Sequence, residues 1–403
     1  MSDTVALMVN ALGPGGAERI VLTICSELLR RGRDVELVCL EREVAYELPP
    51  GLRIVFLSGE GEGPAEGSAP LAGGIAKLLA LPRLARRLAA LSRERGYRAV
   101  QSHLFRANYV NVLSRAFGAR HETEVVNHTK PERLLHEGLP GKANAALARL
   151  LYPRADRIVA ISSRMASDLA AFLGLDESRI ATINNPYEVD RARELASLPS
   201  DCRHEARPGR RTVVAMGRLV PLKRFGDLLE AFAAVAARET DLDLAVLGEG
   251  PERLALETRA SELGLADRVF FPGFAANPYR LLGSAAAFVL SSETEGFPNA
   301  LIEALALGIP VVSTDCVSGP REILAPGSDW RKTMSLGGGV EEAAHGLLVP
   351  VGDPEALAEG LGRILRDKAL AERLRAQGPF RARDFAAGHI VDSYEAMLFP
   401  EEP

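Results

Sequence analysis

Residues 285–314 read AAAFVLSSETEGFPNALIEALALGIPVVST. The apolar run at the start of this stretch predicts a buried strand, and Pro310–Thr314 predicts the next strand. Between the two, Pro298 suits the first turn of a helix, because its missing N–H would have no partner there. Gly308 stands where such a helix ends in a left-handed residue. The stretch therefore predicts a strand, a loop, a helix and a second strand, which form the repeating unit of a parallel sheet.

Two carboxylates frame this loop and helix. Glu295 lies in the loop after the first strand, and Glu303 projects from the helix. The loop leaves the carboxyl edge of the predicted sheet, where open α/β sheets bind ligands. The helix N-terminus offers free N–H groups and the positive end of a dipole, which suit an anion such as a diphosphate. The sequence therefore predicts a ligand site at this edge.

The composition is that of a globular protein. The chain has 403 residues, 47% of them hydrophobic and 25% charged, which excludes disordered and fibrous proteins and favours two domains. The start of the chain lacks the basic region of a signal peptide, and no apolar run reaches the ~18 residues of a membrane span. The cysteines show no metal-binding or CxxC spacing, which fits a reducing cytoplasm; they are Cys25, Cys39, Cys202 and Cys316. We expect a cytoplasmic protein, with any membrane association peripheral.

Charge is unevenly distributed along the chain. The formal net charge is −5, yet residues 75–157 carry 16 Lys/Arg against 6 Asp/Glu. This basic region suits anionic lipid or an anionic acceptor. Arginines on the solvated faces of helices explain it equally well, and the sequence does not decide between the two.

Strands and helices alternate along the chain in two series. The first predicts strands at 4–11, 34–40, 53–57, 98–102, 124–127 and 157–161, and the second at 211–216, 243–247, 269–272, 286–290, 310–314 and 346–349. A hinge is expected between 187 and 197, before a polar, irregular stretch. The predicted fold is α/β, with two doubly wound Rossmann-like domains at 1–190 and 191–383 that face a central cleft, and a C-terminal helix within 384–403.

A basic loop follows the first strand of the second series. It reads GRLVPLKR, and it places Arg218 and Lys223 at the mouth of the sheet. Two cations beside a helix N-terminus clamp a diphosphate without a metal ion. An ordinary basic turn is the alternative, and the neighbouring Glu295 loop favours the clamp.

Glycines end the next two strands. Gly248 and the Pro272-Gly273-Phe274 turn allow close approach by a flat group such as a nucleobase, although plain turn glycines look the same. The loop Gly13–Gly16 near the start lacks both the GxGxxG spacing and the GK[ST] ending. A P-loop and a standard dinucleotide fingerprint are therefore disfavoured.

Two histidines follow strands of the first series. His103 and His128 are both expected at the carboxyl edge of the first sheet. A lone histidine is more often structural, but two at one edge favour a function, most clearly for His128. No GxSxG elbow or HExxH motif is present in the sequence.

Five segments occur in an order that resembles one known family. They are GPGGAER, GRLVPLKR, LGEGPER, EGFPNALIEALALGIPVV and SGPREIL. Together they resemble the retaining GT-B glycosyltransferases of family four, the bacterial glycan-assembly members especially, over nearly the whole chain. The resemblance implies that the C-terminal domain holds a nucleotide sugar and the N-terminal domain most of the acceptor. It also implies that the C-terminal helix crosses back to the first domain.

The resemblance also implies roles for residues that match the family's motifs. Arg218 and Lys223 would bind the donor diphosphate, Glu303 the ribose, and Glu295 the donor sugar near its C3 hydroxyl. His128 would lie near the C6 hydroxyl of that sugar. The other residues on the donor side would contribute backbone groups or allow a close approach; they are Gly15, Gly16, Gly248, Phe274, Phe297, Asn299 and Ala300. On the acceptor side we place His103 and Lys130.

The implied activity is transfer of a hexose or N-acetylhexosamine to a glycan or polyprenyl-linked acceptor, with a UDP-sugar favoured over a GDP-sugar as the donor. The implied reaction is retaining, with no dedicated general base, metal or cofactor. Basic residues 77–98 would hold the protein at the inner face of the plasma membrane, and no nucleic-acid partner is expected. The alternatives are a non-catalytic nucleotide-sugar-binding partner of a glycan synthase and a GT-B nucleotide-sugar epimerase.

Two features depart from the family pattern. Gln101-x-His103 stands where many members have His-x-His, which weakens a role there. The insert at 325–344 carries the only tryptophan, Trp330, beside two basic residues. A surface loop and a contact with membrane or acceptor both remain open for this insert.

Overall fold

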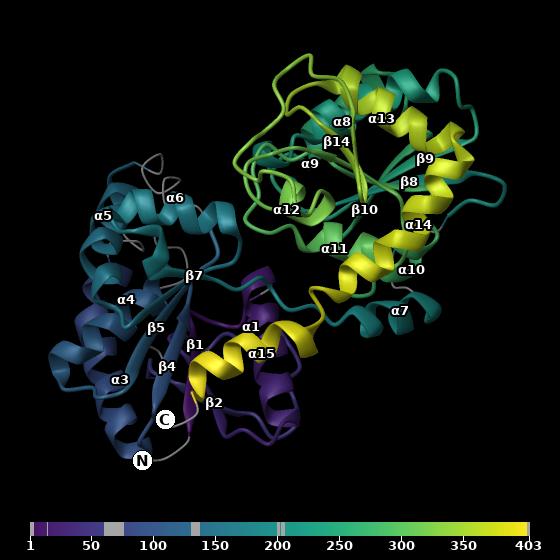
Figure 1. Ribbon diagram of the computed structural model, residues 1–403. Coiled ribbons are helices and arrows are strands. Elements are labelled where there is room, and N and C mark those ends of the chain that lie inside the picture. Colours follow the sequence, from purple (N-terminus) through teal and green to yellow (C-terminus); the bar gives the residue numbers. More distant parts are fainter. Residues whose placement is uncertain are drawn as a thin grey trace. The chain divides into compact units, whose positions relative to one another are not determined.

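The computed structural model describes residues 4–13, 15–59, 76–129, 138–199, 202 and 206–400. The chain falls into two compact units: unit 1 comprises residues 1–186 and 387–403, and unit 2 comprises residues 187–386 (Figure 1). The domain limits predicted from the sequence, 1–190 and 191–383, lie close to these bounds. The division into two domains stays a prediction. Each unit is described by itself below.

Unit 1 contains a seven-stranded parallel sheet in the order β3-β2-β1-β4-β5-β6-β7 within the described residues. Parallel strands covered on both faces are continuously apolar, and β1 and β2 are buried along their whole length. The strand order reverses between β1 and β4. The strands are β1 (Val5–Val9), β2 (Val35–Cys39), β3 (Arg53–Phe56), β4 (Ala99–His103), β5 (Glu122–Asn127), β6 (Arg157–Ala160) and β7 (Ile180–Thr182).

The last helix of the chain packs against the first. Arg31 Nη1 donates to Glu395 Oε2 at 2.5 Å and to Asp392 Oδ1 at 2.8 Å, and Arg33 Nε donates to Glu395 Oε1 at 2.6 Å. These bonds join α15 to the end of α1, so the C-terminus belongs to unit 1. The helices of this unit are α1 (Gly16–Arg30), α3 (Leu81–Arg95), α4 (Phe105–Ser114), α5 (Gly138–Leu151), α6 (Ser163–Leu173) and α15 (Ala387–Leu398).

Unit 2 repeats the doubly wound arrangement, with strand order β10-β9-β8-β11-β12-β14-β13. All its described pairs are parallel except β13 with β14. The strands are β8 (Arg211–Met216), β9 (Leu242–Leu247), β10 (Val269–Gly273), β11 (Ala287–Leu290), β12 (Val311–Thr314), β13 (Glu341–Ala343) and β14 (Gly346–Val349). The helices are α7 (Val189–Ser197), α8 (Phe225–Ala236), α9 (Arg253–Glu262), α10 (Tyr279–Gly283), α11 (Asn299–Ala306), α12 (Pro320–Leu324), α13 (Pro354–Arg366) and α14 (Lys368–Arg383).

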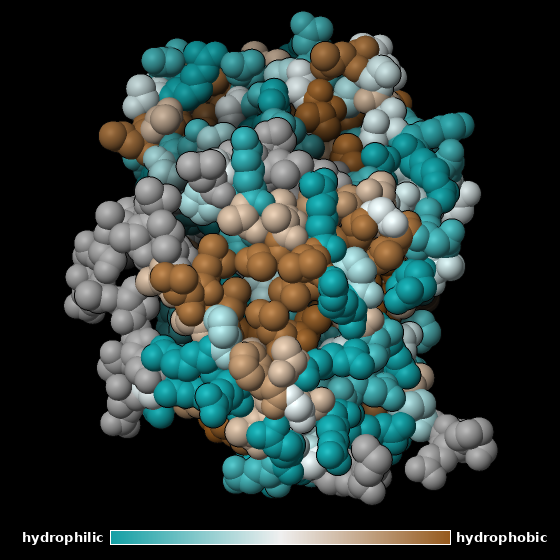
Figure 2. Space-filling view, turned by 90° about the vertical axis from the view of Figure 1, so that its left-hand side faces the viewer, coloured by the Kyte–Doolittle hydropathy of each residue, from teal (hydrophilic) through white to brown (hydrophobic). Residues whose placement is uncertain are grey.

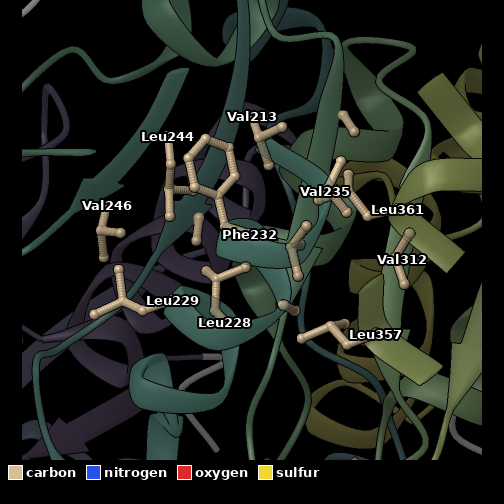
Figure 3. Close-up of a cluster of buried hydrophobic side chains, with 14 of the residues drawn as sticks. Val213, Leu228, Leu229, Phe232, Val235, Leu244, Val246, Val312, Leu357 and Leu361 are labelled. Atoms are coloured by element: carbon tan, nitrogen blue, oxygen red, sulfur yellow. The ribbon is translucent and has the colours of Figure 1, made fainter. Parts of the chain in front are cut away.

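The core of unit 2 lies between α8 and the sheet. Phe232 of α8 is completely buried among side chains from β8, β9 and α13 (Figure 3). The other labelled side chains of this cluster are Val213, Leu228, Leu229, Val235, Leu244, Val246, Val312, Leu357 and Leu361.

The predicted α/β architecture is confirmed, with some local differences. Pro298 was expected in the first helical turn, but it precedes α11 as the N-cap residue, with an extended ψ of 104°. The segment expected to be a hinge contains α7, and the strands β7 and β13 were not predicted. Gly308 ends its helix with φ 69°, as expected.

We expect Phe232→Ala to destabilise unit 2 by about 3–5 kcal/mol, because it removes a large side chain and leaves a cavity. Leu254→Ala on α9 is the matched control, because Leu254 is 75% exposed, and its effect should stay within about 0.5 kcal/mol. Denaturant unfolding followed by a probe in unit 2 measures both. Equal destabilisation by the two substitutions would contradict the burial described here.

Candidate active site

The strand order of unit 2 reverses between β8 and β11, and the loops after these strands are joined. The amide of Glu293 donates to the carbonyl of Leu222 at 2.8 Å, and Ser291 Oγ donates to the carbonyl of Lys223 at 2.8 Å. Ligands of open α/β sheets bind at such a reversal, outside the carboxyl ends of the strands. The predicted basic loop and the predicted carboxylate loop therefore meet at the expected place.

Lys223 and Glu295 form an ion pair across these two loops. Lys223 Nζ donates to Glu295 Oε1 at 2.6 Å, and Ser292 Oγ donates to the same oxygen at 2.5 Å. The side chains of Lys223 and Glu295 are 23% and 10% exposed, so the pair is largely shielded from water. An arriving anion would meet a lysine already held in place by a carboxylate. The sequence did not identify Ser292 as a partner of Glu295.

Arg218 differs from the other cations of the basic loop. It is exposed and forms no ion pair with any residue that the structure describes. Arg224 is instead neutralised, because it donates to Asp227 at 2.7 Å and to Glu293 at 3.3 Å. Arg218 is therefore the cation of this loop whose charge is available to an anion.

The glycine at the end of β9 is required by the neighbouring backbone. Gly248 has φ 134°, and a Cβ there would overlap the carbonyl oxygen of Gly217. The observed close approach is thus between two chain segments, and nucleobase binding by Gly248 stays a prediction. Phe274, after β10, is 76% exposed, so its ring is accessible.

Glu303 is held by a residue that the sequence did not single out. Tyr279 Oη donates to Glu303 Oε1 at 2.8 Å, and Tyr279 is only 2% exposed. The two residues are far enough apart in the sequence that no local pattern connects them. The bond fixes the carboxylate on the second turn of α11.

The N-terminus of α11 contains the other predicted donor residues. Asn299 and Ala300 occupy its first turn, where amides have no acceptor within the helix. Phe297 is 5% exposed and packs edge-on against Phe385, with ring centroids 5.3 Å apart. Asn299 Oδ1 accepts a hydrogen bond from the hydroxyl of Tyr187. The side chain of Phe297 is therefore a packing group of the loop. Donation from its backbone amide to the donor stays a prediction.

A neighbouring turn supports the carboxylate loop. Ser318, with φ 80°, donates through Oγ to the carbonyl of Gly296 at 2.7 Å. Behind it, Arg321 Nη2 donates to the fully buried Asp315 Oδ2 at 2.7 Å and to Glu341 Oε2 at 2.8 Å. Arg321 thus links β12, α12 and β13. Ser318 and Arg321 both belong to the SGPREIL segment, and the sequence spacing alone did not show these contacts.

In unit 1 the two predicted histidines meet. His103 Nδ1 lies 2.9 Å from His128 Nε2, at the carboxyl ends of β4 and β5. Burial lowers the pKa of His128 to about 4, and burial with the neighbouring ring lowers the pKa of His103 well below its usual range. Both rings are therefore neutral at neutral pH. Lys130, also placed at this edge, lies outside the described residues.

The glycine-rich loop is fastened by a tyrosine. The amide of Gly15 donates to Tyr46 Oη at 3.0 Å, and that hydroxyl donates to the carbonyl of Gly15 at 2.9 Å. A Cβ on Gly15 would meet only the carboxylate of Glu18, the movable end of a side chain, so the space around Gly15 does not by itself require a glycine. Gly16 begins α1, so the loop leads directly to a helix N-terminus.

The described residues contain neither a metal-binding cluster nor a membrane-spanning helix. No group of three or more His, Cys, Asp or Glu side chains there is arranged to hold a metal ion. Among the helices of the same ranges, none has the length and apolar character that a membrane crossing requires.

Two family models cover the chain. The model "Glycosyltransferase Family 4" matches residues 14–191, and "Glycosyl transferases group 1" matches residues 201–380. A relative from Campylobacter jejuni, "N-acetylgalactosamine-N,N'-diacetylbacillosaminyl-diphospho-undecaprenol 4-alpha-N-acetylgalactosaminyltransferase", is 30% identical over 380 residues, 94% of each chain. The chain belongs to glycosyltransferase family 4. This family 4 protein is therefore a glycosyltransferase, as the resemblance predicted.

Solved structures agree in fold. The apo lipopolysaccharide outer core galactosyltransferase WaaB matches with a TM-score of 0.70 and 20% identity, over 99% of this chain and 100% of that one. Anabaena Alr3699/HepE in complex with UDP matches with a TM-score of 0.73 and 19% identity, over 98% and 99%. A curated Escherichia coli lipopolysaccharide 1,6-galactosyltransferase is 33% identical over 178 residues, 43% of this chain and 46% of that protein. The fold is GT-B, as predicted.

Because these histidines are neutral in the folded protein, the stability of unit 1 should depend on pH. Unfolded histidine has a pKa of about 6.5, so between about pH 6.5 and 4 the unfolded chain binds a proton that folded His128 does not. The free energy of unfolding of unit 1 should therefore fall as the pH falls, by up to about 1.4 kcal/mol per pH unit for each such histidine. His128→Asn should reduce this slope, measured by denaturant unfolding at several pH values.

The matched control is His389→Asn, because His389 is 72% exposed on α15. An unchanged slope in His128→Asn, or an equal change in the control, would show that His128 is not held neutral. His103 and His121, which are also buried with lowered pKa values, should supply the slope that remains in His128→Asn.

Proposed function

We propose that this protein transfers a hexose or N-acetylhexosamine from a nucleotide sugar, with a UDP-sugar favoured, to a glycan or lipid-linked saccharide in cell-surface glycan assembly. The observation that carries the proposal is the cluster of Lys223, Glu295 and Ser292 beside the exposed Arg218, at the strand reversal of unit 2. A nucleoside diphosphate fits two cations and a helix N-terminus.

Relatives and structural neighbours support the substrate class. The Anabaena protein was solved in complex with UDP, and the Campylobacter relative is named for an undecaprenol-diphosphate-linked acceptor. Other relatives are named for lipopolysaccharide core synthesis, including one from Rhizobium meliloti that is 35% identical over 45% of this chain. These descriptions agree with a nucleotide-sugar donor and a large saccharide acceptor.

The proposed reaction keeps the anomeric configuration of the sugar. The bond from the sugar C1 to the diphosphate oxygen breaks while the bond from C1 to the acceptor oxygen forms on the same face. The proton of the acceptor hydroxyl passes to the leaving phosphate, so no side chain is needed as a base. Arg218 and Lys223 stabilise the charge that develops on the diphosphate, which is where electrostatic catalysis acts.

The remaining residues orient the donor. Glu295 Oε2 faces no hydrogen-bond donor among the described residues, because Lys223 and Ser292 both use Oε1, so it can accept from a sugar hydroxyl. Glu303 is assigned to the ribose and His128 to the C6 hydroxyl. Arg218 and Lys223 supply the positive charge that a metal ion supplies in other transferases, and we propose a metal-independent reaction.

A donor panel without acceptor tests the function. Purified protein should release free nucleotide slowly and selectively from one UDP- or GDP-sugar, with no loss in EDTA. Lys223→Ala should lower this release about 100-fold or more, because it removes a charge that acts on the transition state. Lys368→Ala, an exposed lysine at the start of α14, is the matched control.

Silence across the panel with no thermal shift from UDP or GDP would contradict a transferase and favour the non-catalytic partner. Release restored only by Mn²⁺ after EDTA would contradict the metal-free reaction alone. Equal loss in Lys223→Ala and Lys368→Ala would contradict the assigned site.

We also propose that unit 1 binds the anionic inner face of a membrane from the cytoplasm. Figure 2 shows apolar side chains gathered on the face that carries α3, α4 and α5, with hydrophilic side chains around them. Leu79, just before α3, is 76% exposed, and Leu150 of α5 is 53% exposed. Arg83 and Arg86 of α3 are exposed nearby in the sequence, within the predicted basic segment 77–98. Apolar insertion and basic charge together suit an anionic lipid surface.

Cosedimentation with vesicles tests the membrane contact. The protein should bind phosphatidylglycerol-containing vesicles more tightly than phosphatidylcholine vesicles, and Arg86→Ala should weaken binding about fivefold, near 1 kcal/mol per charge. Leu79→Ser should also weaken it. Phe380→Ser on α14 of unit 2 is the control, because Phe380 is 69% exposed. The proposed surface would be contradicted if binding did not depend on lipid charge, or if Leu79→Ser and Phe380→Ser weakened binding equally.

A further inference from the structure

The turn from β4 into α4 contains a strained residue beside a buried histidine. His103 ends β4 and is completely buried. Leu104 follows with φ 73° and ψ 150°, a conformation that is essentially restricted to glycine. Such residues cost about 1–3 kcal/mol each and persist mostly at functional sites. The strain therefore favours a functional role for the neighbouring His103.

The only hydrogen bond of His103 through its ring, within the described residues, is the one to His128. Nδ1 of His103 is 2.9 Å from Nε2 of His128, and the rings are tilted by 35° with centroids 5.2 Å apart. β4 and β5 are adjacent, with His103 in register with Val126, so the two rings leave neighbouring strands at the same edge. Because both rings are neutral, one of them donates and the other accepts.

The burial of His103 decides the direction of this bond. Nε2 of His103 is buried and has no hydrogen-bond partner among the described residues. If His128 donated, the single proton of His103 would have to lie on Nε2, leaving a buried N–H without an acceptor, which native proteins rarely tolerate. If His103 donates from Nδ1, its Nε2 is a bare nitrogen and no N–H is orphaned.

We propose that His103 Nδ1–H donates to His128 Nε2, and that His103 is thereby a positioning residue that fixes His128 in its Nδ1–H tautomer. Nε2 of His128 then has its lone pair occupied. Nδ1 of the half-buried His128, which makes no hydrogen bond within the described residues, becomes the ring's one remaining polar group.

The tautomer determines what His128 can bind. An Nδ1–H group donates to an oxygen, so His128 would select a hydroxyl or carboxylate oxygen on the ligand and would not act as a base. This consequence rests on the proposed function, in which His128 meets the donor sugar. The tautomer itself does not depend on the activity.

The surrounding structure keeps His128 in place for this role. Asn127, 2% exposed, donates through Nδ2 to the carbonyl of Thr129 at 2.6 Å and so closes the chain around His128. Asn108 of α4 donates to the carbonyl of Val126 at 3.1 Å and fastens that helix to β5. The backbone on both sides of the histidine pair is thus tied down.

Nitrogen NMR of the whole protein with ¹⁵N-labelled histidine tests the tautomer directly. In the wild type, His128 should show a protonated Nδ1 and an unprotonated Nε2. His103→Phe keeps a ring but removes the donor, and His128 should then shift toward the Nε2–H form. His103→Asn is the conservative control, because the Asn amide can donate from a similar position, and it should retain the wild-type tautomer.

A protonated Nε2 on wild-type His128 would overturn the proposal, even if no variant folds. An unchanged His128 tautomer in a folded His103→Phe would overturn it as well.

Kinetics on the donor found in the panel separate positioning from packing. His103→Phe should lower kcat about tenfold, equivalent to about one hydrogen bond, with little change in the donor KM. His103→Asn should keep most of the wild-type kcat. In a His128→Ala background, His103→Phe should cause no further loss, because it acts through His128. A further tenfold loss there would overturn the proposal. If no donor is turned over, the proposed function fails, while the NMR result still decides the tautomer.

Discussion

The ion pair between Lys223 Nζ and Glu295 Oε1, at 2.6 Å, is the interaction on which the site in unit 2 depends. It joins the loops on the two sides of the strand reversal, where open α/β sheets bind their ligands. Ser292 binds the same carboxylate oxygen, and a backbone bond from Glu293 to Leu222 closes the connection. Lys223 is therefore held against the carboxylate loop that leads into α11 before any ligand arrives.

This pair is better explained by function than by stability. A largely buried ion pair gains little net stability, because desolvation of the charges offsets their attraction. Removing one partner, however, leaves the other charge uncompensated. The surrounding structure shows that the position matters, since Ser318 adopts a left-handed φ to hold the carbonyl of Gly296, and Arg321 is buried with Asp315 behind it. Strained and buried polar groups are thus concentrated around one loop.

Unit 1 presents a different chemistry at the corresponding edge. Its strand ends contain neutral histidines and a glycine loop held by Tyr46, where unit 2 has cations and carboxylates. Leu104 gives this edge its own strained residue. Neutral imidazole rings can hydrogen-bond to the hydroxyl groups of a sugar, whereas the charged edge of unit 2 suits a diphosphate.

The sequence predicted the parallel sheets well because buried strands are local apolar runs. β8 and β14 have the predicted bounds, and the Glu295 loop and His128 both follow strands as expected. What the sequence missed are contacts between distant segments: Tyr279 with Glu303, Tyr46 with Gly15, and Arg321 with Glu341. The sequence pattern of one segment does not show which distant residue its side chains will contact.

A crystal structure of the protein with UDP tests the role of the Lys223–Glu295 pair most directly. We expect the diphosphate to contact Arg218, Lys223 and the first-turn amides of α11, with the ribose on Glu303. We also expect Lys223 to keep its place between the diphosphate and Glu295. A diphosphate bound away from these residues, with the Lys223–Glu295 pair untouched, would contradict the assignment of this site to the donor.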